Sequence, residues 1–181
     1  MKKLFFLLAV ATMFSTKSLA QPTAKEWNQG VVGWNLGNQF ECPAPGQDGG
    51  TMSFSCPEGS INAETSWGNP VVTERTIKAV KAAGFNAVRL PVRWQFHIID
   101  AQTMAVDEAW MNRIKEVVKW CLACDLKVII NTHHDQWLES RPTYQYQEEN
   151  NRLLALLWTN IAKAFANYDY RVAFAGTNEV H

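Results

Sequence analysis

The stretch KVIINTHH, residues 127–134, joins a short apolar run to polar residues at its carboxyl end. The apolar middle is typical of a strand buried on both faces, and Asn131, His133 and His134 follow it. Helical patterns flank the stretch, one opening at Asp107 and the other covering residues from about 148 to 167. A buried strand between two helices predicts a parallel sheet of the α/β class.

The same alternation extends along the chain. Strands are expected at residues 30–38, 86–92, 127–134 and 171–179, and a further helix is capped by Thr73 and stopped by Gly84. The order β, α, β, α, β, α, β predicts parallel strands joined by right-handed crossovers. No linker or short repeat divides the chain, so we interpret residues 21–181 as belonging to one domain.

Residues 1–20 have the layout of a secretory signal peptide. Lys2 and Lys3 precede an apolar run, and Ser18-Leu19-Ala20 resembles a cleavage site. The run is too short for a membrane span. We therefore expect an exported protein that is secreted, periplasmic or at the cell surface, with no membrane span after cleavage. The chain has 17 basic and 17 acidic residues and no basic block, which argues against nucleic acid as a partner.

The cysteines form two pairs in the sequence. Cys42 and Cys56 bracket a loop rich in Gly, Pro and Ser, and in an exported protein this favours a disulfide over two free thiols. Cys121 and Cys124 end a helical pattern, whereas a reactive C-x-x-C motif is typically at a helix N-terminus. We interpret the second pair as buried structural residues.

Polar residues follow the apolar run of every predicted strand. In α/β folds these carboxyl ends share one edge of the sheet, where ligands bind. Each of these residues could instead have a structural role. Arg89 could pair with a carboxylate in the core, and His133 or His134 could form a hydrogen bond with the backbone. Glu179 is costly at the mouth of an apolar strand, where the surroundings would favour a general acid. His133 and His134 point to opposite faces as neighbours in a strand and cannot easily bind one ion together, so no metal site is expected.

Six motifs along the chain together resemble glycoside hydrolase family 5, the cellulase family. They are GWNLGN, ETSWGNP, GFNAVRLPVRW, VDEAWMNRIKEVV, VIINTHHD and FAGTNEVH, and the resemblance runs from about Gly33 to the last residue. It implies a (β/α)8 TIM barrel, of which this chain holds about the first four β-strands and three helices. It also implies retaining cleavage of β-1,4-linked glucans or mannans, with no metal or organic cofactor.

The resemblance also implies site residues. Glu179 would be the general acid/base, and Asn178 would bond the 2-hydroxyl of the sugar at the cleaved bond. Arg89 would keep the nucleophile ionised. His133, His134, Asn38 and Glu41 are also expected to contact sugar. Trp137 and Trp94 are candidates for packing against sugar rings. For the two tryptophans, packing in the core or a loop is the alternative.

Two features depart from the family pattern. Val180 follows Asn178-Glu179 at the position where the family usually has proline. The family's nucleophile, a second Glu on strand seven, is absent from this chain. We therefore expect the N-terminal half of a barrel that is inactive and poorly soluble in isolation, and a monomer at full length.

The leading hypothesis for the parent enzyme is an endo-β-1,4-glucanase acting on cellulose-type polysaccharide. A β-mannanase, xyloglucanase or β-1,3-1,4-glucanase of the same family is the nearest alternative. A non-catalytic carbohydrate-binding relative and a metal-dependent barrel hydrolase are the others.

Overall fold

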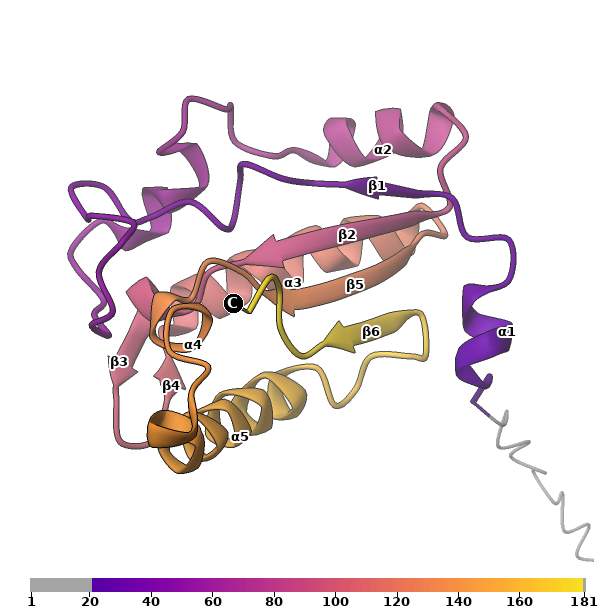
Figure 1. Ribbon diagram of the computed structural model, residues 1–181. Helices are drawn as coiled ribbons and strands as arrows, with labels where there is room; N and C mark the ends of the chain where they lie inside the picture. The colour runs from indigo at the N-terminus through magenta and orange to yellow at the C-terminus, as the bar shows by residue number, and fades with distance from the viewer. Residues whose placement is uncertain (1–20, 181) are drawn as a thin grey trace, which may run out of the picture.

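Four parallel strands form the main sheet of this protein, whose computed structural model describes residues 21–180. Their order in the sheet is β1 (Gly33–Asn35), β2 (Ala87–Val92), β5 (Lys127–Thr132) and β6 (Val172–Ala175). Helices α2 (Glu74–Ala82), α3 (Glu108–Ala123) and α5 (Gln147–Ala164) connect them in turn (Figure 1). The predicted order of strands and helices is confirmed, and it is the order found in part of a (β/α)8 barrel.

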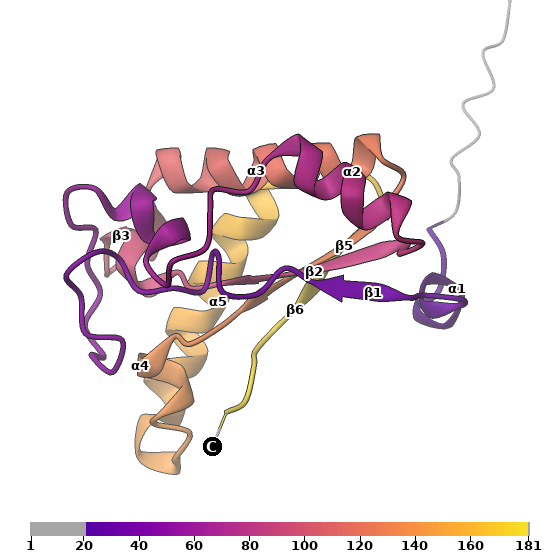
Figure 2. The ribbon, with the colours of Figure 1, turned by 90° about the horizontal axis from the view of Figure 1, so that it is seen from above.

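The register of the sheet separates two faces. Asn35 pairs with Arg89, and Arg89 with Ile129, so these side chains share one face. Val88 and Val128 alternate with them and are fully buried in the core with residues of α2, α3 and α5. Figure 2 shows α2 and α3 along one side of the sheet. The core therefore lies between sheet and helices, and the polar side chains lie on the opposite face.

The helix boundaries follow the predicted capping residues. Thr73 and Thr76 form a reciprocal capping box at the start of α2, and Asp107 accepts a hydrogen bond of 2.9 Å from the backbone N–H of Trp110 in α3. Gly84, with φ of +97°, follows α2 in a left-handed conformation that favours glycine. Local chemistry thus decides where these helices begin and end.

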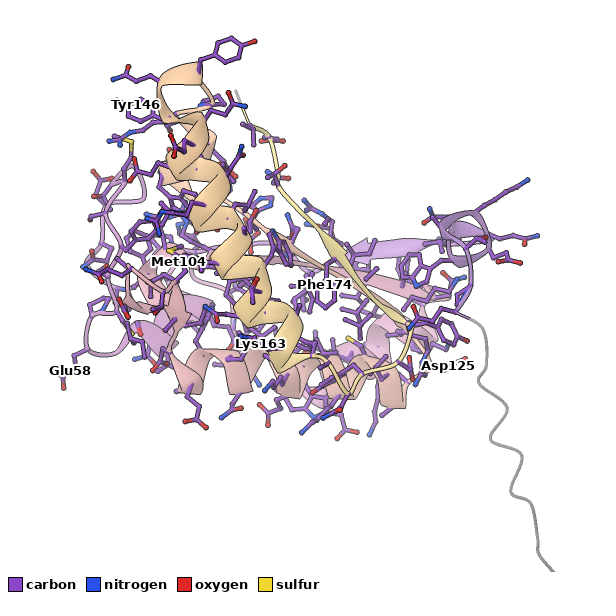
Figure 3. All side chains as sticks on the ribbon, turned by 90° about the horizontal axis from the view of Figure 1, so that it is seen from below. Glu58, Met104, Asp125, Tyr146, Lys163 and Phe174 are labelled. Carbon is purple, nitrogen blue, oxygen red and sulfur yellow. The ribbon has the colours of Figure 1, made fainter. Side chains whose placement is uncertain are left out.

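Strand β6 ends earlier than predicted, at Ala175 rather than at residue 179. The hydroxyl of Thr132 and the indole N–H of Trp158 both donate to the carbonyl of Gly176, at 2.9 and 3.1 Å. These bonds direct the Gly176 carbonyl to side chains, and the pairing of β6 with β5 ends at Ala175. Phe174 lies beside α5, as Figure 3 shows, and its ring centroid is 5.7 Å from that of Trp158.

Several short elements were not predicted because they are too brief to show periodicity. They are α1 (Ala24–Asn28), η1 (Ser60–Thr65), η2 (Gln95–His97), β3 (Ile98–Asp100), β4 (Ala105–Val106), α4 (Gln136–Glu139) and η3 (Tyr144–Tyr146). Helix α1 lies at the amino end of the strands (Figure 1), where the Trp27 indole donates to the carbonyl of Tyr170 at 2.7 Å.

A buried ion pair fastens the long loop between β1 and α2 to helix α3. The Arg113 guanidinium donates to both carboxylate oxygens of Glu64, at 2.8 and 2.9 Å. Glu64 also accepts from the backbone N–H of Val72 at 2.7 Å, and Arg113 donates to the Val72 carbonyl at 2.6 Å. The pair therefore binds both backbone groups of Val72, its N–H and its carbonyl.

The predicted disulfide between Cys42 and Cys56 is wrong for this structure, in which both thiols are free. Cys42 is buried, whereas the half-buried Cys56 has its sulfur 3.5 Å from the Ser60 hydroxyl. Burial raises the pKa of Cys42 to about 11 and that of Cys121 to about 12, so neither favours a reactive thiolate.

The predicted signal peptide lies outside the described residues. Within residues 21–180, no helix combines the length and apolar character needed to cross a membrane.

The buried His97 yields a prediction for acid stability. Its ring stacks on Trp110 with centroids 3.7 Å apart, and neither ring nitrogen has a partner in the described chain. Burial lowers its pKa from 6.5 to about 3, so between these values the unfolded chain binds more protons than the folded one. Folding stability attributable to His97 is therefore lost as the pH falls from 6.5 towards 3.

Replacing His97 by phenylalanine keeps an aromatic ring and removes the titration. We expect the urea-unfolding free energy of the full-length variant to fall less steeply with acidification, by up to about 1.4 kcal/mol per pH unit between pH 6.5 and 4. Parallel curves for variant and wild type would show that His97 does not control the acid response.

Candidate active site

Arg89 is the centre of a polar cluster at the carboxyl ends of the strands. Its guanidinium donates to the side-chain oxygen of Asn35 at 2.9 Å and to that of Asn178 at 2.7 Å. One of its nitrogens also lies 3.5 Å from Nδ1 of His133. Because these residues come from or follow β1, β2, β5 and β6, the convergence predicted from the strand ends is present in the structure.

The positive charge of Arg89 lacks an acidic partner among residues 21–180. Its hydrogen-bond partners there are neutral amides and an imidazole, and it forms no ion pair with the described carboxylates. A half-buried guanidinium in this state favours an anionic group nearby. The site is thus electrostatically suited to a carboxylate.

His133 is a neutral imidazole with a defined tautomer. Burial, and then the neighbouring His134 and Arg89, lower its pKa to about 4. Its Nδ1 faces two donors, Arg89 and, at 3.2 Å, the Asn131 amide nitrogen. That amide nitrogen also donates to the Thr132 carbonyl at 2.8 Å, which fixes its orientation. Nδ1 therefore accepts, and Nε2 carries the proton.

His134 is held by a residue that the sequence reasoning missed, Glu139 of α4. The buried Glu139 carboxylate accepts from the His134 backbone N–H at 2.8 Å, and its second oxygen lies 3.7 Å from His134 Nδ1. His134 has φ of +58°, and its ring meets that of His133 edge-on at 4.3 Å. A four-residue helix offers no sequence signal for such a partner.

Asp135 joins the carboxyl ends of β2 and β5. One of its oxygens accepts from the backbone N–H groups of Trp94 and Gln95, at 2.9 and 2.8 Å. The other is buried without a partner in the described chain, and burial raises the pKa of Asp135 to about 7. A carboxyl only 1% exposed and committed to the backbone supports the loops and does not reach a substrate.

The structure places Glu41 and Asn38 outside the Arg89 cluster. Glu41 is buried, and its two oxygens accept from the backbone N–H groups of Asn38 and Gln39. It therefore holds the loop, contrary to the expected sugar contact. A Cβ on Gly37 would lie 2.6 Å from the side-chain amide nitrogen of Asn35, so a larger residue there would displace that side chain. Asn38 is exposed, with φ of +59°.

The expected stacking role of Trp137 is not supported, because the side chain is only 4% exposed. Its ring packs against Phe54 with centroids 5.6 Å apart. Trp94 is fully buried as well. The alternative of core and loop packing, left open by the sequence, describes both residues.

Asn178 and Glu179 follow β6 and differ in environment. The Asn178 side-chain oxygen is held by Arg89, whereas its amide nitrogen is buried without a partner among the described residues. Glu179 is exposed in the described part of the chain, with φ of +31°. Residues 21–180 contain no group of three or more His, Cys, Asp or Glu side chains placed to hold a metal ion.

Fold and site together define a β/α-barrel type of protein with a polar cluster at the carboxyl ends of its strands. Residues 47–181 match the model of the cellulase family, glycosyl hydrolase family 5. The chain belongs to this family, as its motifs indicated.

Similar proteins are known by sequence and by structure. The chain is 40% identical to a cellulase/esterase of Acetivibrio thermocellus, covering 82% of this chain and 16% of that protein. It is 38% identical to a xyloglucan-specific endo-β-1,4-glucanase of Bacteroides ovatus, covering 83% and 28%. A broad-specificity endoglucanase from Ruminococcus champanellensis with bound cellotriose is 36% identical, with a TM-score of 0.74, covering 85% and 42%. The chain thus spans less than half the length of each.

Proposed function

We propose that the full-length protein is a retaining endo-β-1,4-glucanase in which Glu179 is the general acid/base. The observation that carries this proposal is the state of Asn178, the residue before Glu179. Arg89 holds its oxygen, which leaves a buried, unpartnered N–H donor beside the carboxylate. Such a donor suits the 2-hydroxyl of a sugar at the cleaved bond, and that bond strengthens in the transition state.

The mechanism requires a second carboxylate as nucleophile, about 5 Å from the first. Arg89 has no acidic partner among residues 21–180, which supports a position for the nucleophile close to it. A guanidinium keeps a nearby carboxylate ionised. We infer that a part of the protein outside this sequence supplies it, since the solved relative is more than twice as long as the matched segment. Glu179 would protonate the leaving oxygen, the nucleophile would attack the anomeric carbon, and Glu179 would then activate water.

Cellulose-type polysaccharide is the proposed substrate, and xyloglucan is the second candidate because the Bacteroides ovatus relative is specific for it. β-Mannan and β-1,3-1,4-glucan remain family alternatives. Assaying the full-length protein on carboxymethylcellulose, xyloglucan and glucomannan separates them. Release of reducing sugar from carboxymethylcellulose supports the proposal, whereas activity on mannans alone would refute it.

The same assay addresses the other classes of function. A non-catalytic carbohydrate-binding protein would bind these polymers without releasing sugar, and a metal-dependent hydrolase would lose activity with strong chelators. We further propose that the protein is exported by its signal peptide and is monomeric at full length. Recovery of the protein outside the cytoplasm without residues 1–20 tests export, and size-exclusion chromatography of that protein tests the monomeric state.

Arg89 yields a prediction for activity. Lysine keeps the charge of arginine but lacks its planar fork, so Arg89→Lys cannot hold Asn35 and Asn178 together. We expect kcat/KM on carboxymethylcellulose to fall by about ten- to a hundredfold, which is about 1.4–2.8 kcal/mol of transition-state stabilisation. Arg75→Lys on the exposed surface of α2 is the matched control and should leave activity unchanged. Equal activity of the two variants would contradict the proposed role.

A further inference from the structure

Arg93 is a buried cation directly after the carboxyl end of β2. Only 3% of the residue is exposed, and its guanidinium lies over the ring of Phe96, 5.4 Å from the ring centroid. Its Nε and Nη1 atoms have no hydrogen-bond partner within residues 21–180, and the ion pairs of these residues do not include Arg93. A charge removed from water to this degree is costly unless opposite charges lie around it.

The opposite charges belong to Asp135, Glu139 and Glu41, which are only 1%, 7% and 4% exposed. Burial lowers the pKa of the Arg93 guanidinium, whereas the charges of these three acids act to raise it. Each acid is therefore close enough to interact with the cation, although none forms a direct ion pair with it in the described chain. One guanidinium thus offsets up to three buried carboxylates.

Each of these acids holds a loop by accepting hydrogen bonds from backbone N–H groups. Glu41 accepts from Asn38 and Gln39 after β1, Asp135 from Trp94 and Gln95 after β2, and Glu139 from His134 after β5. The three strands are neighbours in the sheet, and the segments that follow them gather at one end of it (Figure 1). Arg93 is therefore a charge shared by three loops at the end of the sheet that carries the Arg89 cluster.

Two further titratable residues, Cys42 and His133, lie near Arg93. Burial raises the pKa of the Cys42 thiol to about 11, so this thiol is neutral at ordinary pH. Burial is the main cause of the low pKa of His133, about 4, and the charge of Arg93 acts in the same direction. Neither residue changes its charge between about pH 5 and 9. In this range the three acids and His134, which lies 3.7 Å from Glu139, set the charge balance around Arg93.

We propose that Arg93 is a positioning residue, the shared counterion through which Glu41, Asp135 and Glu139 hold three loops beside the candidate active site. It acts through its charge, since its Nε and Nη1 atoms form no hydrogen bond in the described chain. Burial raises the pKa of Asp135 to about 7, and Arg93 opposes this rise. The ionised form of Asp135 therefore depends on Arg93, whereas the neutral form does not. The effect on loop stability is independent of the reaction, and the effect on catalysis rests on the proposed function.

The first test is a double-mutant cycle in the full-length protein, measured by thermal unfolding. Asp135→Asn keeps an oxygen acceptor for the two backbone N–H groups but cannot ionise. Because the pKa of Asp135 is raised in the folded state, its contribution to stability is present in acid and is lost as the pH rises towards 7. At pH 8, Asp135→Asn should raise Tm by about 4 °C more in an Arg93→Met background than in wild type.

The cycle carries two controls. At about pH 5 the difference between the backgrounds should vanish, because Asp135 is then neutral with or without Arg93. Arg113→Met removes another buried arginine, whose direct partner is Glu64. In that background Asp135→Asn should change Tm as it does in wild type.

The second test measures whether the charge matters for the site. The kcat/KM of Arg93→Met on carboxymethylcellulose should fall by about tenfold at pH 8 and by less than about threefold at pH 5. Arg93→Lys keeps the positive charge and should stay within about threefold of wild type at both pH values. Arg113→Met should keep the wild-type ratio between the two pH values.

The outcomes separate this inference from the proposed function. An equal Tm effect of Asp135→Asn in all three backgrounds at pH 8 would refute the shared counterion. Coupling in Tm with an unchanged pH dependence of kcat/KM would refute the positioning role, and so would equal losses for Arg93→Lys and Arg93→Met. If Arg93→Met does not fold at pH 8, adding Asp135→Asn should restore folding, and its failure while Arg113→Met folds would contradict the proposal. If the wild-type protein releases no sugar, the proposed function is refuted, and the Tm cycle still decides whether Arg93 is the counterion.

Discussion

Replacing Glu179 by glutamine in the full-length protein is expected to lower kcat on carboxymethylcellulose by about 10²–10⁴-fold. Glutamine has nearly the same shape as glutamate, so Asn178 and Arg89 can keep their hydrogen bond. It cannot donate a proton to the leaving oxygen or take one from water. The loss should therefore appear in kcat, while polymer binding persists.

The leaving group provides a sharper test of the same prediction. The phenolate of an aryl cellobioside leaves with little protonation when the phenol is acidic. The bond-breaking step of this substrate should therefore be slowed much less by Glu179→Gln than polymer cleavage is. Glu58→Gln is a suitable control, since Glu58 is exposed and lies at the periphery of the molecule (Figure 3). Equal losses on both substrates would show that Glu179 does not act as the acid.

Replacing Glu64 by alanine is expected to destabilise the fold by about 3–5 kcal/mol. The change leaves the Arg113 guanidinium, whose side chain is only 12% exposed, without its buried counterion. It also removes the acceptor for the backbone N–H of Val72. Urea unfolding of the full-length protein should show a lower midpoint.

The same arginine supplies the control, because Arg113 also pairs with Glu116, whose side chain is 52% exposed. Glu116→Ala should change the unfolding free energy by less than about 1 kcal/mol, since an exposed pair is screened by water. The double variant Glu64→Ala with Arg113→Met should cost less than the sum of the two single changes, because no buried charge remains unpaired. Additive costs would contradict the ion-pair interpretation.

Much of the fold could be predicted because it depends on local patterns. The long helices show apolar periodicity, Thr73 and Asp107 cap two of them, and Gly84 ends one. The short elements were missed because two to six residues carry no measurable period. The disulfide was mispredicted because the spacing of Cys42 and Cys56 along the chain does not show whether the fold brings their sulfurs together.

The residues of the candidate site could likewise be predicted only in part. Arg89, His133 and Asn178 could be predicted to meet, because parallel strands place their carboxyl ends along one edge. Glu41 and Trp137 lie in or near loops, where burial depends on tertiary packing that residue type does not reveal. Glu139 contacts His134 through a short helix, again a tertiary contact.

The state of His133 has a consequence for how the site responds to acidity. With a pKa near 4 and Nδ1 already occupied, the imidazole presents an N–H from weakly acidic to alkaline solution. A hydroxyl oxygen placed there meets the same donor throughout this range. The hydrogen bond that His133 would offer to a sugar is therefore insensitive to pH above about 5, and a pH optimum in this region would report other groups, the proposed acid/base and its partner carboxylate among them.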